Sequence, residues 1–311
     1  MTTENLNQKK SFFIKYKKEI KAYSLIALPL IWWGIFFVFA FFRSFYFSLT
    51  DLRFSIDQIS KFSFDNYARI LNPNHEFFDV TFWKSLKTTM IWTVVMMLGN
   101  NVMGLALAFL LTRLKKGAKF FLGLLFWPTL VSAVVGADLM KMIFNSSESG
   151  LMNKLLSLFN ISAISWFDDT QFALIGLMIT PFLLGFTVKL LIYYASMLSI
   201  PKSYYEAAEL ETKNGFKVFR IITLPLIKNA LVLNLVLSLI EGFKVLGPMQ
   251  LVTGGGPDNS TLSTVLYIYQ LGFERSRMGQ ASAYAFILFA IILILTLVQL
   301  KLSGKEADTH E

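Results

Sequence analysis

The chain has 311 residues, of which 55% are hydrophobic and only 16% are charged, and its mean hydropathy is +0.55. So few polar groups do not cover a soluble globular protein of this size, and the composition therefore favours a protein that lies in a lipid bilayer. The formal net charge is +9, but the basic residues lie between hydrophobic stretches rather than among exposed aromatic residues, which excludes a typical nucleic-acid-binding face.

Six apolar stretches are long enough to cross a bilayer, since a helix needs about 20 residues to span the hydrocarbon core. We expect them at Tyr23 to Phe42, Thr88 to Leu111, Phe120 to Phe144, Phe172 to Met197, Leu224 to Val245 and Ala281 to Leu302. The sequence therefore predicts an all-α membrane protein with six transmembrane helices in one domain, residues 23–302.

The charges in the loops predict the orientation of the chain. Lysine and arginine gather before the first span and in the loops after the second and fourth spans, whereas the other loops carry more acidic residues. Because basic loops stay on the cytoplasmic side, we expect both termini to be cytoplasmic, with a basic arm at 1–22 and a tail at 303–311. The first apolar run is long and lacks a small-residue cleavage pattern, so we expect an uncleaved span rather than a signal peptide.

Residues suited to catalysis or metal binding are scarce. The chain has no cysteine and two histidines, His75 and His310, which excludes disulfides and thiolate chemistry and leaves little for a metal centre. A membrane enzyme would need a nucleophile, base or metal cluster at one depth, and no such cluster is evident in the pattern. We expect a chain without a catalytic site, bound cofactor or metal of its own.

The segment 201–225 between the fourth and fifth spans is too polar to cross the membrane but is regularly patterned. Ser203 and Glu206 stand at capping-box spacing, which predicts a helix that begins near Tyr204. Asn214 and Gly215 are typical of a left-handed helix stop.

A second amphipathic turn is expected from Phe216 to Ile222, after which Pro225 should redirect the chain into the fifth span. The pattern alone fits either a helix that lies on the membrane or a docking element. Two small residues in a row, Ala207 and Ala208, favour docking because they let another protein approach the helix backbone closely.

Two motifs resemble a known family. The residues Glu206, Ala207 and Ala208, followed by Phe219, Ile222, Leu224 and Pro225, resemble the EAA loop of permease subunits of binding-protein-dependent ABC importers. The family usually has Asp-Gly where this chain has Glu211 and Thr212, with Gly215 a few residues later. The segment Val252, Thr253, Gly254, Gly255, Gly256, Pro257 and then Ser260 and Thr261 resembles the TGGGP segment of the sugar-importing branch, which holds maltose, glycerol-phosphate and multiple-sugar permeases.

The glycine run of the TGGGP segment does not fit a phosphate-binding loop. No Lys-Ser or Lys-Thr pair follows the glycines, as a P-loop requires, and the run falls on the predicted outer side. We therefore expect ATP and Mg to bind to a separate subunit.

The resemblance implies a type I ABC importer permease. It implies a multi-pass, pore-forming subunit in the inner (cytoplasmic) membrane that passes sugars or oligosaccharides through a mid-membrane cavity by alternating access. The implied partners are a second, non-identical permease, two cytoplasmic ATPase subunits, an extracytoplasmic sugar-binding protein, the sugar and the lipid bilayer, but no nucleic acid.

The resemblance also implies two sets of site residues. Those expected to contact the ATPase in a coupling helix are Glu206, Ala207, Ala208, Glu211, Gly215 and Pro225. Those expected to line the substrate cavity are Thr129, Ala133, Leu184, Gly185, Val188, Ser238, Glu241, Gly242 and Val245, with Ser238 the best single candidate. Because these positions offer few polar groups, either the partner permease supplies much of the recognition or Phe186 and Phe243 stack on the sugar.

Charged residues inside the predicted spans need partners, since each costs about 3 kcal/mol on insertion scales. Glu241 has two possible partners, namely Lys244 on its own helix and Lys189 across the cavity. A similar local pair is expected between Asp138 and Lys141.

An ion-coupled secondary carrier is the alternative from another mechanistic class, although the two halves of the chain show no convincing repeat. Within the ABC class, a permease for a solute such as glycerol phosphate also fits.

Overall fold

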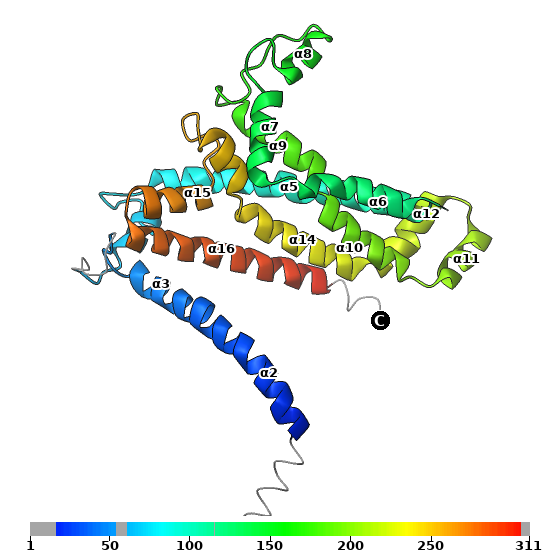
Figure 1. Ribbon diagram of the computed structural model, residues 1–311, viewed down its shortest axis with the longest axis horizontal. Coiled ribbons are helices and arrows are strands. Elements are labelled where there is room, and N and C mark those ends of the chain that lie inside the picture. Colours follow the sequence, from blue (N-terminus) through cyan, green and yellow to red (C-terminus); the bar gives the residue numbers. More distant parts are fainter. Residues whose placement is uncertain (1–16, 54–60, 115, 306–311) are drawn as a thin grey trace, which may run out of the picture.

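The computed structural model describes residues 17–53, 61–114 and 116–305, and within these ranges the chain is almost entirely helical (Figure 1). An isolated bridge between Thr50 and Phe62 is the β pairing found in this part of the chain. Within these ranges four helices are long and apolar enough to cross a membrane, and two bent helix pairs bring the number to six if each pair is one span. This agrees with six apolar stretches in the sequence.

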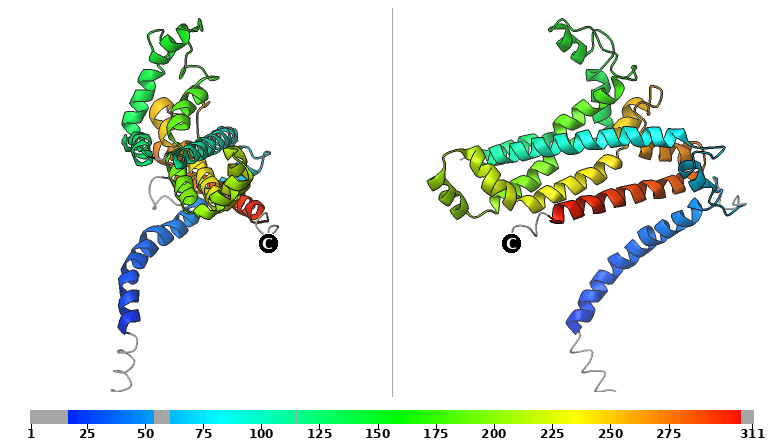
Figure 2. Two further views of the ribbon diagram at one scale, coloured as in Figure 1. Left: turned by 90° about the vertical axis from the view of Figure 1, so that its right-hand side faces the viewer. Right: turned by 180° about the vertical axis from the view of Figure 1, so that it is seen from behind.

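The first span runs away from the other helices toward its N-terminal end, α2 (Lys17–Trp33) (Figures 1 and 2). Helices α2, η1 (Gly34–Phe39) and α3 (Ala40–Ser48) follow one another directly, and the candidate span Lys21–Ser48 extends past the predicted end at Phe42. No residue in its most apolar window is buried. Most of the predicted basic arm, residues 1–16, lies outside the described residues, and α2 already begins within 1–22.

Helix α5 (Val80–Thr112) is the central element of the fold. It packs along α10 (Thr187–Leu198) and α14 (Lys228–Phe243), and α16 (Met278–Lys305) lies against α14 and α3. The sequence placed the start of the second span at Thr88, but the helix begins at Val80 because the Asp79 side chain accepts a hydrogen bond from the Phe82 amide at 3.1 Å and caps it.

Two glycines allow these helices to pack closely. A Cβ at Gly104 of α5 would lie 2.9 Å from the backbone nitrogen of Leu190 on α10, and a Cβ at Gly242 of α14 would lie 2.9 Å from the Cα of Thr93 on α5. Neither position has room for a larger side chain without a shift of the backbone.

The third predicted span is bent rather than straight. Helices α6 (Ala118–Phe126) and η3 (Trp127–Leu130) meet α7 (Ala133–Ile143) at 89°. The break falls where Val131 and Ser132 adopt extended backbone angles and the Ser132 hydroxyl caps α7. The sequence predicted one span from Phe120 to Phe144, since hydropathy does not reveal a change of direction.

The predicted fifth span is also broken. The segment α12 (Gly215–Val218), η4 (Phe219–Thr223) and α13 (Leu224–Leu226) meets α14 at 73°. The bend lies at Ile227, two residues after Pro225, so the redirection expected at Pro225 takes place just beyond it.

The remaining elements complete the two ends of the molecule. Helix α9 (Ala173–Leu184) and α10 form the candidate span Ala173–Leu198, close to the predicted fourth span. Helix α11 (Lys202–Glu211) lies at one end of the long helices (Figure 1). The short elements away from it are α4 (Asp65–Leu71), α8 (Leu151–Ser157), η5 (Met249–Thr253), α15 (Thr264–Tyr269) and η6 (Gln270–Glu274).

Candidate functional site

Helix α11 has the predicted position but different ends. It begins at Lys202, after Pro201, and no side chain caps it, so the capping box expected from Ser203 and Glu206 does not form. The fixed φ of Pro201 is suited to the residues that start a helix, which explains the earlier start.

The end of α11 also differs from the prediction. The helix stops at Glu211 because Thr212 is extended, with ψ 136°. Asn214 does not adopt the left-handed conformation. Its side chain instead accepts hydrogen bonds from the amides of Phe216 and Lys217, at 3.0 and 3.3 Å, and caps α12.

One face of α11 carries exposed residues at helical spacing, namely Ser203, Glu206, Ala207 and Leu210. Leu210 is 90% exposed. Leu210 thus places an exposed apolar side chain on the same face as Glu206 and Ala207. The family motif does not include Leu210, and its place four residues after Glu206 is the signal that would have revealed it.

The other face of α11 turns toward the segment α12–η4. Ala208 and Glu211 line a cavity of about 220 Å³ together with residues of that segment, including Val218 and Ile222, and Ala207 belongs to both the exposed face and this lining. The hydroxyls of Tyr205 and Thr223 share a hydrogen bond of 3.2 Å across the two elements. The two halves of the predicted coupling segment are therefore in contact.

A buried polar network joins α5, α10 and α14. Tyr193 donates to the Asn101 side-chain oxygen at 2.7 Å, and the Asn101 amide donates to the Ser238 hydroxyl at 2.8 Å. Ser238 in turn donates to the Asn234 carbonyl at 2.7 Å, and the Asn234 amide donates to the Lys189 carbonyl at 3.2 Å. Buried polar groups in apolar surroundings need such partners.

An ion pair joins α10 to α14. The Lys189 ammonium contacts the Glu241 carboxylate, which decides between the two partners expected for Glu241. Lys189 is buried, whereas the Glu241 side chain is 58% exposed. Neither Lys244 nor the expected pair of Asp138 and Lys141 forms a salt bridge among the described residues.

Helix packing separates the predicted cavity residues into two sets. Those exposed on this subunit are Thr129, Ala133, Leu184, Gly185, Val188 and Glu241, and those buried within it are Ser238, Gly242 and Val245. The Ser238 hydroxyl is buried and both donates and accepts a hydrogen bond inside the bundle. Phe186 and Phe243 are also buried, which disfavours their stacking on a sugar.

At the end of α5 away from α11, Asp79 joins three elements. Its Oδ2 accepts hydrogen bonds from the hydroxyls of Tyr267 on α15, at 2.6 Å, and Tyr284 on α16, at 2.8 Å. Burial, together with the neighbouring carboxylate, raises the pKa of Tyr267 above its usual value, so this hydroxyl remains a donor. No local pattern in the sequence predicts this cluster, since the three residues are far apart in the chain.

The glycine-rich segment after α14 forms a tied loop. Gly254 and Gly255 have φ values of +62° and +94°, a region that disfavours residues with a side chain. The hydroxyls of Thr253 and Thr261 share a hydrogen bond of 2.7 Å, and Thr261 donates to the Gly256 carbonyl at 2.7 Å. These contacts provide a structural reason for the motif.

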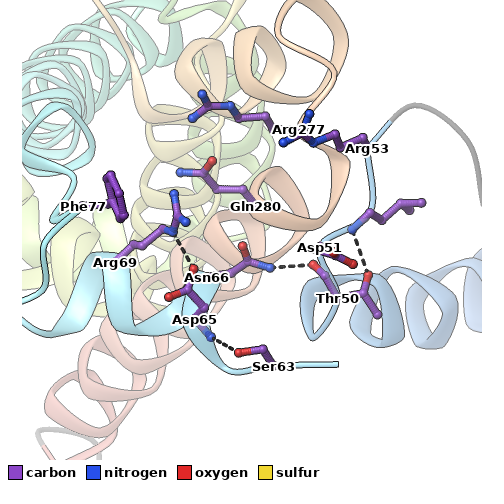
Figure 3. A pocket seen from close by; sticks show the side chains of 11 residues that line it. Thr50, Asp51, Arg53, Ser63, Asp65, Asn66, Arg69, Phe77, Arg277 and Gln280 are labelled. Atoms are coloured by element: carbon purple, nitrogen blue, oxygen red, sulfur yellow. Dashed lines mark hydrogen bonds and ion pairs between the residues drawn. The ribbon is translucent and has the colours of Figure 1, made fainter. Parts of the chain in front are cut away.

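A polar pocket of about 360 Å³ lies between the end of α3, α4 and the start of α16 (Figure 3). Arg53, Arg69 and Arg277 contribute to its wall, and Arg69 bonds to Asp65 at 2.8 Å. The Arg69 hydrogen bond holds the pKa of Asp65 below its usual value, and His75, at 2.9 Å, acts in the same direction. Arg53 and Arg277 form no ion pair within the part of the chain that the structure describes.

The chain matches a family model described as binding-protein-dependent transport system inner membrane component, over residues 100–305. It is 29% identical to the arabinooligosaccharides transport system permease protein AraP of Bacillus subtilis, covering 93% of this chain and 90% of the relative. It is 27% identical to the multiple sugar-binding transport system permease protein MsmF of Streptococcus mutans, covering 91% of this chain and 95% of the relative.

Solved structures with the same fold include a bacterial ABC transporter involved in the import of the acidic polysaccharide alginate. Its matching chain superimposes with a TM-score of 0.80 at 19% identity, over 95% of this chain and 99% of that one. A second structure shows the bacterial alginate transporter in complex with an alginate pentasaccharide-bound periplasmic protein. Its matching chain superimposes with a TM-score of 0.78, over 94% of this chain and 97% of that one. At this identity the likeness describes the fold alone.

Proposed function

Because the chain belongs to the family of binding-protein-dependent transport system inner membrane components, we propose that it is the pore-forming permease subunit of an ATP-driven importer of sugars or oligosaccharides. The observation that carries the proposal is helix α11, which lies at the end of the long apolar helices and carries an exposed apolar side chain, Leu210. The relatives named as permeases for arabinooligosaccharides and multiple sugars support the substrate class.

In this proposal the chain lies in the cytoplasmic membrane with α11 and both termini on the cytoplasmic side. The distribution of lysine and arginine supports this orientation, since Lys202, Lys213, Lys217 and Arg220 lie at the α11 end.

Helix α11 docks on a cytoplasmic ATPase subunit that binds ATP and Mg. Glu206 and Ala207 form the contact predicted from the motif, and Leu210 adds the apolar anchor, since exposed apolar side chains at helical spacing fit a groove on a partner. Ala208, Glu211 and Gly215 act behind this face, toward α12. Two ATPases that close on ATP then move two such helices and rock the permeases between inward-open and outward-open states.

A second permease completes the pathway. The first span has no buried residue in its most apolar window and its α2 part runs away from the bundle, and Leu184 and Val188 are also exposed on this chain. We assign these surfaces to lipid and to a non-identical partner permease, with the sugar held between the two subunits. The exposed set of cavity residues, including Glu241, then faces the sugar.

The external sugar-binding protein docks at the opposite end. The pocket with Arg53, Arg69 and Arg277 lies at that end, and guanidinium groups there suit carboxylates on a docking protein. Arg277→Glu should therefore weaken docking without affecting assembly with the ATPase.

The proposal is tested by purifying the tagged chain from its source and identifying the proteins that co-purify. We expect an ATPase and a second permease with the native chain, and loss of the ATPase with Glu206→Lys or Leu210→Asp. Leu158→Asp is the matched control, because Leu158 is also an exposed leucine, at 75%, but lies beside α8 on the other side of the span Ala173–Leu198.

The alternatives predict different results. A chain that purifies without an ATPase and moves sugar on an ion gradient would be a secondary carrier, and the proposal would be wrong. An intact complex that imports glycerol phosphate but no sugar would retain the ABC mechanism and change the solute.

A further inference from the structure

The coupling segment has a second connection to the bundle besides the chain itself. The α12–η4 segment leads into α14 through the bend at Ile227, and it also packs on the end of α5. Phe219 of η4 lies against Phe109 of α5, with ring centroids 4.6 Å apart. The segment that follows α12 is therefore in direct contact with α5.

Arg113, the residue after α5, strengthens this connection. Its guanidinium carbon lies 4.5 Å from the centroid of the Phe109 ring, a distance typical of a cation–π contact. The same guanidinium fills the space beside Gly215, the first residue of α12. A Cβ at Gly215 would lie 2.1 and 2.4 Å from the two terminal nitrogens of Arg113.

This packing explains why a glycine stands at position 215. Gly117, Gly254 and Gly255 have positive φ values, but Gly215 does not, so its backbone conformation does not require glycine. The guanidinium of Arg113 occupies the space that a side chain at 215 would need. A larger residue at 215 would push this flexible group aside and would thereby remove its contact with α12.

We propose that Arg113 is a positioning residue that couples α12 to α5, and that Gly215 serves this coupling by leaving room for the Arg113 guanidinium. The inference rests on the proposed function, in which α11 receives movement from the ATPase. Helix α5 has 33 residues, a length of about 50 Å, and reaches the Asp79 cluster at the opposite end. One rigid helix thus joins the coupling segment to the outer elements α15 and α16.

Arg113 also has a simpler explanation, as one of the basic residues that orient the chain in the membrane. The two roles differ in what they require of the side chain. Orientation needs a positive charge, which lysine supplies equally well, whereas filling the space between Phe109 and Gly215 needs a flat guanidinium. Arg113→Lys therefore separates them.

The first measurement uses the purified full-length chain and needs no partner. Hydrogen exchange of the backbone amides in 215–223 reports how firmly α12 and η4 are held. We expect exchange to rise several-fold in Arg113→Ala, Arg113→Lys and Gly215→Ala, and to rise no further in the double variant Arg113→Ala/Gly215→Ala. Lys119→Ala, which removes a nearby exposed charge on α6, should leave it unchanged.

The second measurement uses the assembled importer in proteoliposomes. ATP hydrolysis is compared with and without the binding protein loaded with arabinotriose or maltotriose, taking the sugar that stimulates the native complex. The three single variants should retain the ATPase but show a several-fold lower stimulation.

Native exchange and stimulation in Arg113→Lys would overturn the inference, because charge alone would then suffice. Additive effects in the double variant would overturn it as well, since Arg113 and Gly215 would then act independently. A native chain that recruits no ATPase would instead overturn the proposed function, and the exchange measurement would still decide whether Arg113 holds α12.

Discussion

Lys189 on α10 and Glu241 on α14 form an ion pair between two helices of the bundle, with the ammonium buried and the carboxylate exposed on the face assigned to the substrate path. Glu241→Gln should lower stability by about 1–3 kcal/mol, because it leaves a buried charge without its partner while solvent partly screens the exposed group. Thermal unfolding of the purified chain measures this loss.

The double variant Lys189→Met/Glu241→Gln should recover most of that loss, since no buried charge remains. Lys244→Gln is the control, because Lys244 is exposed and forms no salt bridge within the described ranges. An equal loss in Lys244→Gln would show that Lys244, and not Lys189, stabilises Glu241.

Gly104→Ala should separate α5 from α10. The added methyl group would lie 2.9 Å from the Leu190 backbone nitrogen and 3.2 Å from the Phe186 carbonyl oxygen, and backbone atoms do not move aside easily. We expect a loss of about 1–3 kcal/mol, typical of an overpacked interior. Gly123→Ala on α6 is the matched control, because a Cβ there meets nothing within 4 Å; equal melting temperatures for the two variants would contradict the close packing.

Asp79→Ala should destabilise the end of the molecule away from α11. The change removes the cap of α5 and leaves the hydroxyls of Tyr267 and Tyr284 without their acceptor. Together these losses should cost about 2–4 kcal/mol. Asp79→Asn retains one acceptor oxygen and should cost less, and hydrogen exchange in the first turn of α5 would distinguish the two variants.

The pair of Asp65 and Arg69 should make stability depend on pH in the acid range. The pKa of Asp65 is lower in the folded chain than its usual value of about 3.9, because Arg69 donates a hydrogen bond to it. The contribution of the pair is therefore complete above the unfolded pKa and is lost as the pH falls through the folded pKa. The melting temperatures of the native chain and Asp65→Asn should differ at pH 6 and converge toward pH 3; a constant difference would contradict this.

Ser238 and Val188 should respond differently to substitution. Ser238→Ala removes the acceptor of the Asn101 amide inside the bundle and should cost about 1 kcal/mol of stability, with little change in the sugar concentration that gives half-maximal transport. Val188→Trp, on the exposed face, should obstruct transport while the complex still assembles. The opposite pattern would place Ser238 in the substrate path.

The sequence by itself determined the class of the molecule and the location of its coupling segment. Six apolar stretches follow from composition along the chain, because the bilayer requires a fixed length of apolar helix. The segment 201–225 stands out between two of these stretches because it is too polar to cross the bilayer. Its motif and the TGGGP segment indicate the family without any knowledge of tertiary contacts.

Only the tertiary structure decided how the spans bend and which residues face each other. The breaks near Ser132 and Ile227 depend on local backbone angles that hydropathy does not report. Asn214 caps the next helix instead of ending the previous one, since either role suits the same residue type.

The same limit applies to Ser238, Lys189 and Arg113. Rotation of a helix about its axis decides whether a side chain meets a neighbouring helix or the solvent, and packing against other helices sets that rotation. The neighbours concerned, Asn101, Glu241 and Gly215, lie 137, 52 and 102 residues away in the chain, so no local pattern in the sequence contains them.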